Sequence, residues 1–90
     1  MKKYYIYNGE TLKETKLTKE VKRIFDLKRC KNKPIAIFHG WSPNPLEHYR
    51  AFEITPQGLK QLTGSGWHFV IYEVFLNEDA IKTKWRDYIE

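Results

Sequence analysis

His39 and His48 are the side chains of this 90-residue chain whose types and spacing best suit acid–base chemistry. Imidazole accepts and releases a proton near neutral pH, so a pair of histidines on neighbouring strands can act as the acid and base of a small ribonuclease. If the segments on either side of the Pro-rich residues 42–45 pair as strands, one register places Ile35 opposite Phe52 and His39 opposite His48. Both histidines are therefore weak catalytic candidates. A structural or surface role for both is the alternative that the sequence favours.

No metal or cofactor site is predicted. His68 could lie near the other histidines, but no cysteine or carboxylate lies at a ligand spacing typical of metal sites. The Gly64-Ser65-Gly66 segment follows a predicted helix and precedes a predicted strand, the reverse of the order in a phosphate-binding loop. Cys30 lies among basic residues, which could lower the pKa of its thiol, yet no base accompanies it, so we expect an inert thiol.

The positive charge is concentrated in one part of the sequence. The formal net charge of +5 divides into +7 for residues 1–45 and −2 for residues 46–90. Residues 13–33 contain nine basic and three acidic side chains. Basic arrays bind phosphate backbones because each neutralised phosphate releases counterions. The candidate polyanion contacts are Lys19, Lys22, Arg23, Arg29, Lys31 and Lys33.

A solvated, Lys-rich helix face is the alternative explanation of this charge. Only four residues are Arg, and Arg is the side chain that most often makes bidentate contacts with bases. Aromatic side chains beside the basic array would favour nucleic acid, because bases stack on them. Tyr4, Tyr5 and Tyr7 are candidates for stacking, with core packing or an edge strand as the alternative. Trp41 and Tyr49, on either side of the Pro-rich loop, are candidate anchors for a protein interface.

The first half of the chain contains clear turn and cap signals. Asn8-Gly9 between two strand-like runs predicts a hairpin of residues 2–7 with residues 10–15. Thr18 is a predicted N-cap for a helix over residues 18–30, because apolar residues recur there at helical spacing. Strands are predicted over residues 34–41 and 47–54.

The second half predicts a short helix, a central strand and a final helix. Thr55-Pro56 resembles a capped helix start with proline at the first position. Residues 67–76 are apolar at successive positions, as in a strand buried on both faces. Asn77 is the predicted N-cap of the last helix. The order ββαββ(α)βα predicts an α+β fold, with a mostly antiparallel sheet of about five strands, two main helices and one short helix, and the helices on one face.

Length and composition limit the class of protein. Ninety residues form a single domain, 1–90, and 16% aromatic residues indicate an ordered core. No apolar run approaches the length of a membrane span, so no membrane partner is expected. A lone cysteine forms no internal disulfide, which predicts a cytoplasmic protein.

Three functions remain open at this point. The first is a small non-enzymatic binding protein that associates with nucleic acid through the basic helix of residues 18–33. The second is an inhibitor or adaptor that binds a host protein, of the kind that phages and mobile elements encode. The third is a small ribonuclease-like toxin. The expected partner is therefore nucleic acid or an acidic protein surface.

Overall fold

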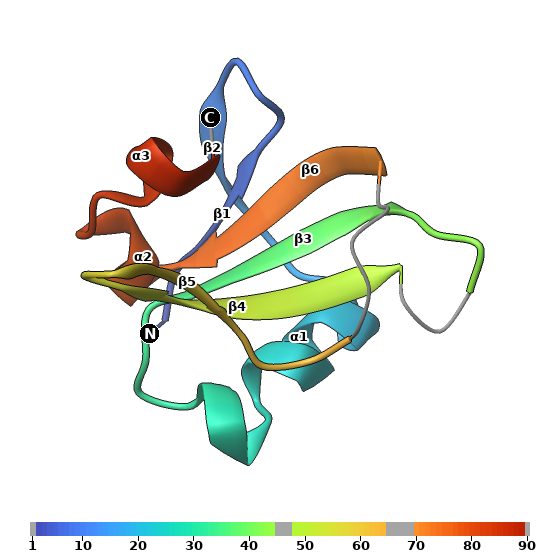
Figure 1. The fold of residues 1–90 in the computed structure, drawn as a ribbon, viewed down its shortest axis with the longest axis horizontal. Coiled ribbons are helices and arrows are strands. Elements are labelled where there is room, and N and C mark those ends of the chain that lie inside the picture. The colour runs from blue at the N-terminus through green and yellow to red at the C-terminus, as the bar shows by residue number, and fades with distance from the viewer. Residues whose placement is uncertain (1, 45–47, 65–69, 90) are drawn as a thin grey trace.

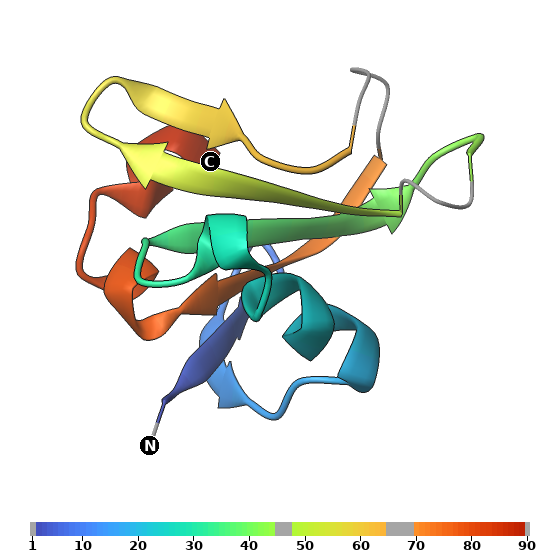
Figure 2. The same ribbon diagram turned by 90° about the horizontal axis from the view of Figure 1, so that it is seen from below.

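The computed structural model describes residues 2–44, 48–64 and 70–89, and its centre is a six-stranded antiparallel sheet with the order β2-β1-β6-β3-β4-β5 (Figure 1). The strands are β1 (Tyr4–Tyr7), β2 (Leu12–Thr15), β3 (Ile35–Trp41), β4 (Tyr49–Thr55), β5 (Gly58–Gln61) and β6 (Val70–Asn77). The predicted α+β class is confirmed, with six strands where about five were expected. Figure 2 shows β4 and β5 at one edge of the sheet and β1 and β2 at the other.

The helices cover both faces of the sheet, so the expectation that they share one face is wrong. The helical segments are α1 (Lys19–Phe25), the 3-10 turn η1 (Lys28–Cys30), α2 (Glu78–Ile81) and α3 (Trp85–Ile89). Figure 1 shows α1 and η1 below the sheet and α3 above it. The cause lies in β3, where four consecutive residues from Ile35 are buried, so apolar side chains on both sides of the strand need cover.

Two apolar clusters result, one on each face. The cluster on the α2–α3 face contains the buried residues Tyr7, Ala36, Phe38, Ile54, Val74, Leu76, Ala80 and Trp85. The cluster on the α1 face contains Val21, Phe25, Cys30, Ile35, Ile37, Ala51 and Phe75. Residues of β3 and β6 alternate between these clusters, as successive side chains of a strand must.

The N-terminal hairpin is confirmed. Tyr7 pairs with Leu12 across the turn, and the Asn8 side-chain oxygen accepts hydrogen bonds from the backbone of Glu10 at 2.9 Å and Thr11 at 2.8 Å. Gly9 has a φ of 96°, a conformation that glycine adopts without the penalty that a Cβ imposes.

The predicted helix over residues 18–30 is broken in the structure. Thr18 caps it as expected and accepts a hydrogen bond from Val21 at 3.4 Å, but α1 ends at Phe25. In a continuous helix Lys28 would share the face of Val21 and Phe25 and would enter the core. The extended backbone at Leu27 starts η1 instead and turns Cys30 inward.

The predicted pairing of β3 with β4 is wrong by one residue. His39 pairs with Tyr49, and Ala36 pairs with Phe52. Phe52 packs its ring 5.0 Å from the ring of Phe38, on the α2–α3 face. A shift of one residue would turn Phe52 to the opposite face, so packing on both faces decides the register.

The predicted short helix at Thr55-Pro56 is also wrong, because β4 turns there into β5. The Thr55 hydroxyl accepts from Gln57 N–H at 3.2 Å and donates to the Gly58 carbonyl at 2.7 Å. Gly58 has a φ of 131°, which favours glycine. Threonine and proline are thus used to close a hairpin and not to open a helix.

The C-terminal third is confirmed in outline. β6 lies between β1 and β3 and is central as predicted, although residues 67–69 of the predicted strand lie outside the described residues. Asn77 caps α2 by accepting from Ala80 N–H at 3.0 Å. The expected single final helix is divided into α2 and α3 by a turn in which the Thr83 hydroxyl donates to the Ala80 carbonyl at 2.6 Å.

Candidate functional site

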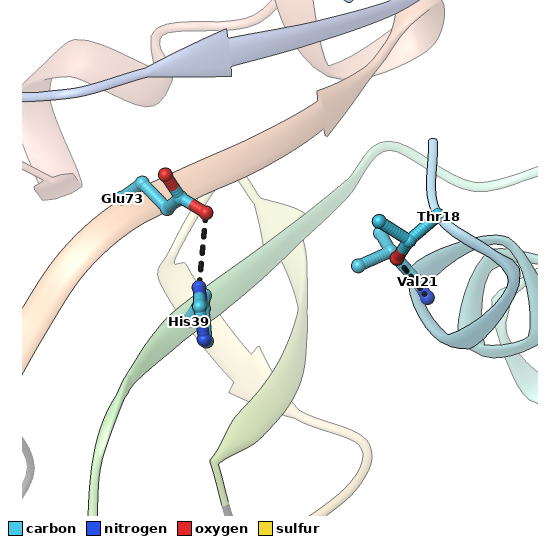
Figure 3. A network of polar contacts seen from close by, with 4 residues as sticks. All are labelled: Thr18, Val21, His39 and Glu73. Carbon is cyan, nitrogen blue, oxygen red and sulfur yellow. Dashed lines mark hydrogen bonds and ion pairs between the residues drawn. The ribbon is translucent and has the colours of Figure 1, made fainter. Parts of the chain in front are cut away.

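The side chains best placed for chemistry lie near the end of the sheet where β3 finishes and β6 begins. His39 on β3 is the cross-strand partner of Glu73 on β6. The His39 Nδ1 atom lies 2.9 Å from Glu73 Oε2 (Figure 3). The two side chains are 28% and 30% exposed, so the pair is held within the fold and solvent still reaches it.

Two tyrosine rings contact the imidazole of His39. The His39 ring stacks on Tyr49 with 4.4 Å between centroids and 9° between planes. The Tyr72 ring meets it edge-on at 5.9 Å and 85°. Because Tyr49 also packs against the cluster that contains Val21 and Phe25, this arrangement lies on the α1 face of the sheet.

A β-bulge in β6 brings Tyr72 and Glu73 to the same side. The pairing changes from His39 with Glu73 to Gly40 with Ile71, which leaves Tyr72 as the extra residue of β6. Bulges redirect a side chain that regular alternation would send to the opposite face. The strands approach closely here, since a Cβ on Gly40 would lie 1.9 Å from the Val70 carbonyl oxygen. Glycine at this position is therefore required by the bulge.

Large apolar side chains beside this pair are exposed to solvent. Trp41 is 52% exposed and Tyr72 is 54% exposed. Trp41 follows His39 by two positions on β3 and pairs with Val70, so alternation places both on the α1 face. We call this group the end surface, and it contains His39, Trp41, Tyr49, Val70, Tyr72 and Glu73. It joins one catalytic candidate and both interface candidates that the sequence had indicated separately.

His48 does not belong to the end surface. The observed register places Tyr49 opposite His39, and the His48 backbone carbonyl accepts a hydrogen bond from Gly40 N–H at 3.0 Å. Among the residues that the structure describes, no hydrogen bond or ring contact joins the two imidazoles. The partner of His39 is instead Glu73, which sequence reasoning missed because only the strand order places it there.

The six predicted polyanion contacts divide into two groups. Arg29 donates to the Leu62 carbonyl at 3.0 Å, and the Lys33 Nζ atom lies 3.9 Å from Glu53 Oε1. These two side chains have structural partners. The other four are exposed, namely Lys19, Lys22, Arg23 and Lys31. Three of them lie on α1, on the same face of the sheet as the end surface.

The boundary between α1 and the end surface carries negative charge. Burial raises the pKa of Tyr49, and the carboxylates of Glu20 and Glu73 raise it further. Glu20 belongs to the first turn of α1, so the start of that helix is close enough to Tyr49 to act on its electrostatics. The cationic and aromatic parts are therefore neighbouring regions with two carboxylates at their border.

The first-strand tyrosines pack against core residues. Tyr4 packs on Phe25 with ring centroids 4.9 Å apart, and Tyr7 is buried against Trp85 at 5.0 Å. Tyr5 is half-buried against the α2–α3 cluster. Burial and the charge of Asp26 raise the pKa of Tyr4. These three residues contribute to packing, and the exposed aromatics within the described ranges are Trp41 and Tyr72.

Cys30 is a core residue. It is 1% exposed, and burial raises the pKa of its thiol despite the opposing influence of Arg29 and Lys33. Desolvation of the thiolate therefore outweighs the attraction of the neighbouring basic residues.

Comparisons of the chain with protein-family models, with curated proteins and with solved structures found no match. Within the described ranges, no three metal-ligating side chains lie together as a possible ion site. The helices of the same ranges are too short and too polar to cross a bilayer.

Proposed function

We propose that this protein binds single-stranded nucleic acid along the α1 face of its sheet. The observation that carries the proposal is the presence of exposed Trp41 and Tyr72 on the same face as the exposed basic residues of α1. Proteins that bind single strands combine a cationic track for phosphates with aromatic rings on which bases stack. In a duplex the base faces are already stacked on one another, so rings of this kind favour an unpaired strand.

Each part of this surface has a distinct task in the proposal. Trp41 and Tyr72 stack on bases, and stacking contributes about 1–3 kcal/mol for each base. Lys19, Lys22 and Arg23 contact phosphates and give an affinity that falls as salt rises. Glu20 repels phosphates, so the strand contacts the border beside the first turn of α1 through its bases.

The test of stacking is the affinity of variants for a fluorescent oligouridylate, measured by anisotropy. Trp41→Ala and Tyr72→Ala should each weaken binding about 5- to 150-fold, the equivalent of one stacked base. Ile71→Ala is the matched control, because Ile71 is 49% exposed and regular alternation from Val70 directs it to the opposite face. Equal decreases in affinity for Ile71→Ala and Trp41→Ala would contradict stacking.

The test of the cationic part is the salt dependence of the same affinity. Lys19→Ala with Lys22→Ala should reduce the slope of log affinity against log salt by about 0.7 for each phosphate that the variant no longer neutralises. Lys82→Ala with Lys84→Ala removes the same charge from exposed positions around the α2–α3 turn. If both double variants change the slope equally, net charge and not α1 governs binding.

A protein partner is the second candidate, and a specific observation favours it. Val70 is 59% exposed, and an aliphatic side chain does not stack on bases. With its cross-strand partner Trp41 it forms an exposed apolar area on the α1 face, of the kind that anchors protein interfaces. The test is co-purification of a host protein with the chain. A partner that stays bound at raised salt and is lost in Trp41→Ala would support an inhibitor or adaptor over nucleic-acid binding.

A further inference from the structure

Glu73 fixes how the imidazole of His39 can exchange protons. A carboxylate only accepts hydrogen bonds, so the contact of 2.9 Å requires the hydrogen on Nδ1. In the neutral ring Nε2 then carries the lone pair and is the atom that can accept a proton. Carboxylate–histidine pairs of this form orient the ring and stabilise the imidazolium that forms after proton transfer.

The ring is immobilised without being sealed from solvent. Tyr49 stacks on it and Tyr72 meets it at the edge, yet the His39 side chain keeps 28% of its surface exposed. The bulge at Tyr72 is needed for this arrangement, and bulges occur often beside active sites, where they aim side chains. An ion pair with a purely structural task needs neither the aimed aromatic residue nor the exposure.

The surroundings of His39 indicate which substrate such a base could serve. In the part of the chain that the structure describes, no Ser, Thr or Cys side chain is hydrogen-bonded to His39 as a nucleophile for it to activate. Ser42 is buried and accepts a hydrogen bond from Asn44. RNA carries its own nucleophile, the 2′-hydroxyl beside each phosphodiester.

We propose that His39, oriented by Glu73, is the general base of an RNA-cleaving site on the end surface. The inference rests on the proposed function, which brings a single strand against this surface. His39 Nε2 takes the proton of the 2′-hydroxyl, and the 2′-oxygen forms a bond to the adjacent phosphorus. The bond from phosphorus to the 5′-oxygen breaks, and its electron pair stays on that oxygen, which takes a proton from water.

Solvent removes the proton that His39 has taken up. The hydroxide left by that water takes the proton from the imidazolium, which restores neutral His39. The products are one strand that ends in a 2′,3′-cyclic phosphate and one that begins with a 5′-hydroxyl. DNA and 2′-O-methyl RNA lack the nucleophile, so the site binds them and leaves them intact. His39 is the catalytic residue in this scheme, and Glu73 is a positioning residue.

The experiment incubates the purified full chain with labelled oligouridylate, its 2′-O-methyl analogue and oligothymidylate, and measures binding and cleavage on the same samples. The wild type should bind all three and cleave only the first, with a cyclic phosphate terminus. His39→Ala should lower the cleavage rate of the bound oligomer about 100-fold or more, the range of general-base contributions, with the affinity measured on the same samples. His39→Gln serves if the alanine variant does not fold. His48→Ala is the matched control and should cleave as the wild type does.

A second experiment distinguishes a positioning role of Glu73 from a purely structural one. Glu73→Gln should shift the tautomer equilibrium of His39, read from its ring ¹⁵N chemical shifts, and should lower cleavage, while Glu73→Asp should restore part of the rate. Binding of oligouridylate without cleavage would overturn the catalytic inference and leave the proposed function standing. Cleavage that survives in His39→Ala would overturn it as well. Failure to bind any of the three oligomers would overturn both.

Discussion

Replacement of Asn77 by alanine should destabilise the fold more than its modest size suggests, because one amide joins three elements. Its side-chain oxygen accepts from Ile35 N–H and from Ala80 N–H, both at 3.0 Å. Its nitrogen donates to the Lys33 carbonyl at 2.7 Å. The side chain therefore ties the start of β3 to the end of β6 and caps α2.

The expected loss in the free energy of unfolding is the sum over these three hydrogen bonds. Loss of an N-cap costs about 1 kcal/mol, and each of the other two part-buried hydrogen bonds contributes about 1 kcal/mol. Asn77→Ala should thus lower the free energy of unfolding by about 3 kcal/mol, which in a domain of this size lowers Tm by more than about 10 °C.

Urea unfolding followed by tryptophan fluorescence measures this destabilisation. Asn8→Ala is the matched control, because Asn8 also accepts two backbone hydrogen bonds but at an exposed turn, where water replaces them. It should cost less than about 1 kcal/mol. Asn77→Ser retains a capping oxygen and should fall between the two. A cost for Asn77→Ala no larger than that for Asn8→Ala would show that the Asn77 side chain does not hold these elements together.

Three further predictions concern the bulge, the thiol and the tyrosines. Gly40→Ala should cost at least about 2 kcal/mol in urea unfolding, because the new Cβ would lie 1.9 Å from the Val70 oxygen; a neutral result would contradict the bulge. Cys30 should resist iodoacetamide until urea unfolds the chain, since its pKa is raised and it is buried; rapid alkylation of the native protein would exclude this placement. Tyr4 and Tyr49 have raised pKa values in the fold, so the stability they contribute is complete below the ordinary tyrosine value of about 10 and is lost as pH rises through the raised values. Absorbance titration of Tyr4→Phe and Tyr49→Phe checks this, because each should remove a late-titrating phenol.

The parts of the fold that the sequence predicts are those that local hydrogen bonding decides. Asn8-Gly9 predicts its turn because the side chain of one residue and the backbone freedom of the next are sufficient for it. Thr18 and Asn77 are correct caps for the same reason. Thr55-Pro56 led to the wrong prediction of a helix, because a threonine oxygen can either cap a helix or close a hairpin. Pairing of β4 with β5 decides between the two.

Non-local packing decides the rest. The pairing of His39 with Tyr49 depends on which cluster takes the rings of β4, and no short segment contains that information. The residue types of His39, Trp41 and Tyr49 marked them as candidates before their positions were known. The sequence did not indicate Tyr72 and Glu73 as site residues, because strand order and a bulge bring them to the site.

Backbone and indole N–H chemical shifts during titration with oligouridylate show which face of the sheet binds a single strand. We expect the shifts to concentrate on Trp41, Tyr72 and the exposed turns of α1, and the buried Trp85 indole to be unaffected. Shifts confined to α2 and α3, or no shifts at an oligomer excess, would contradict binding of a single strand on the α1 face.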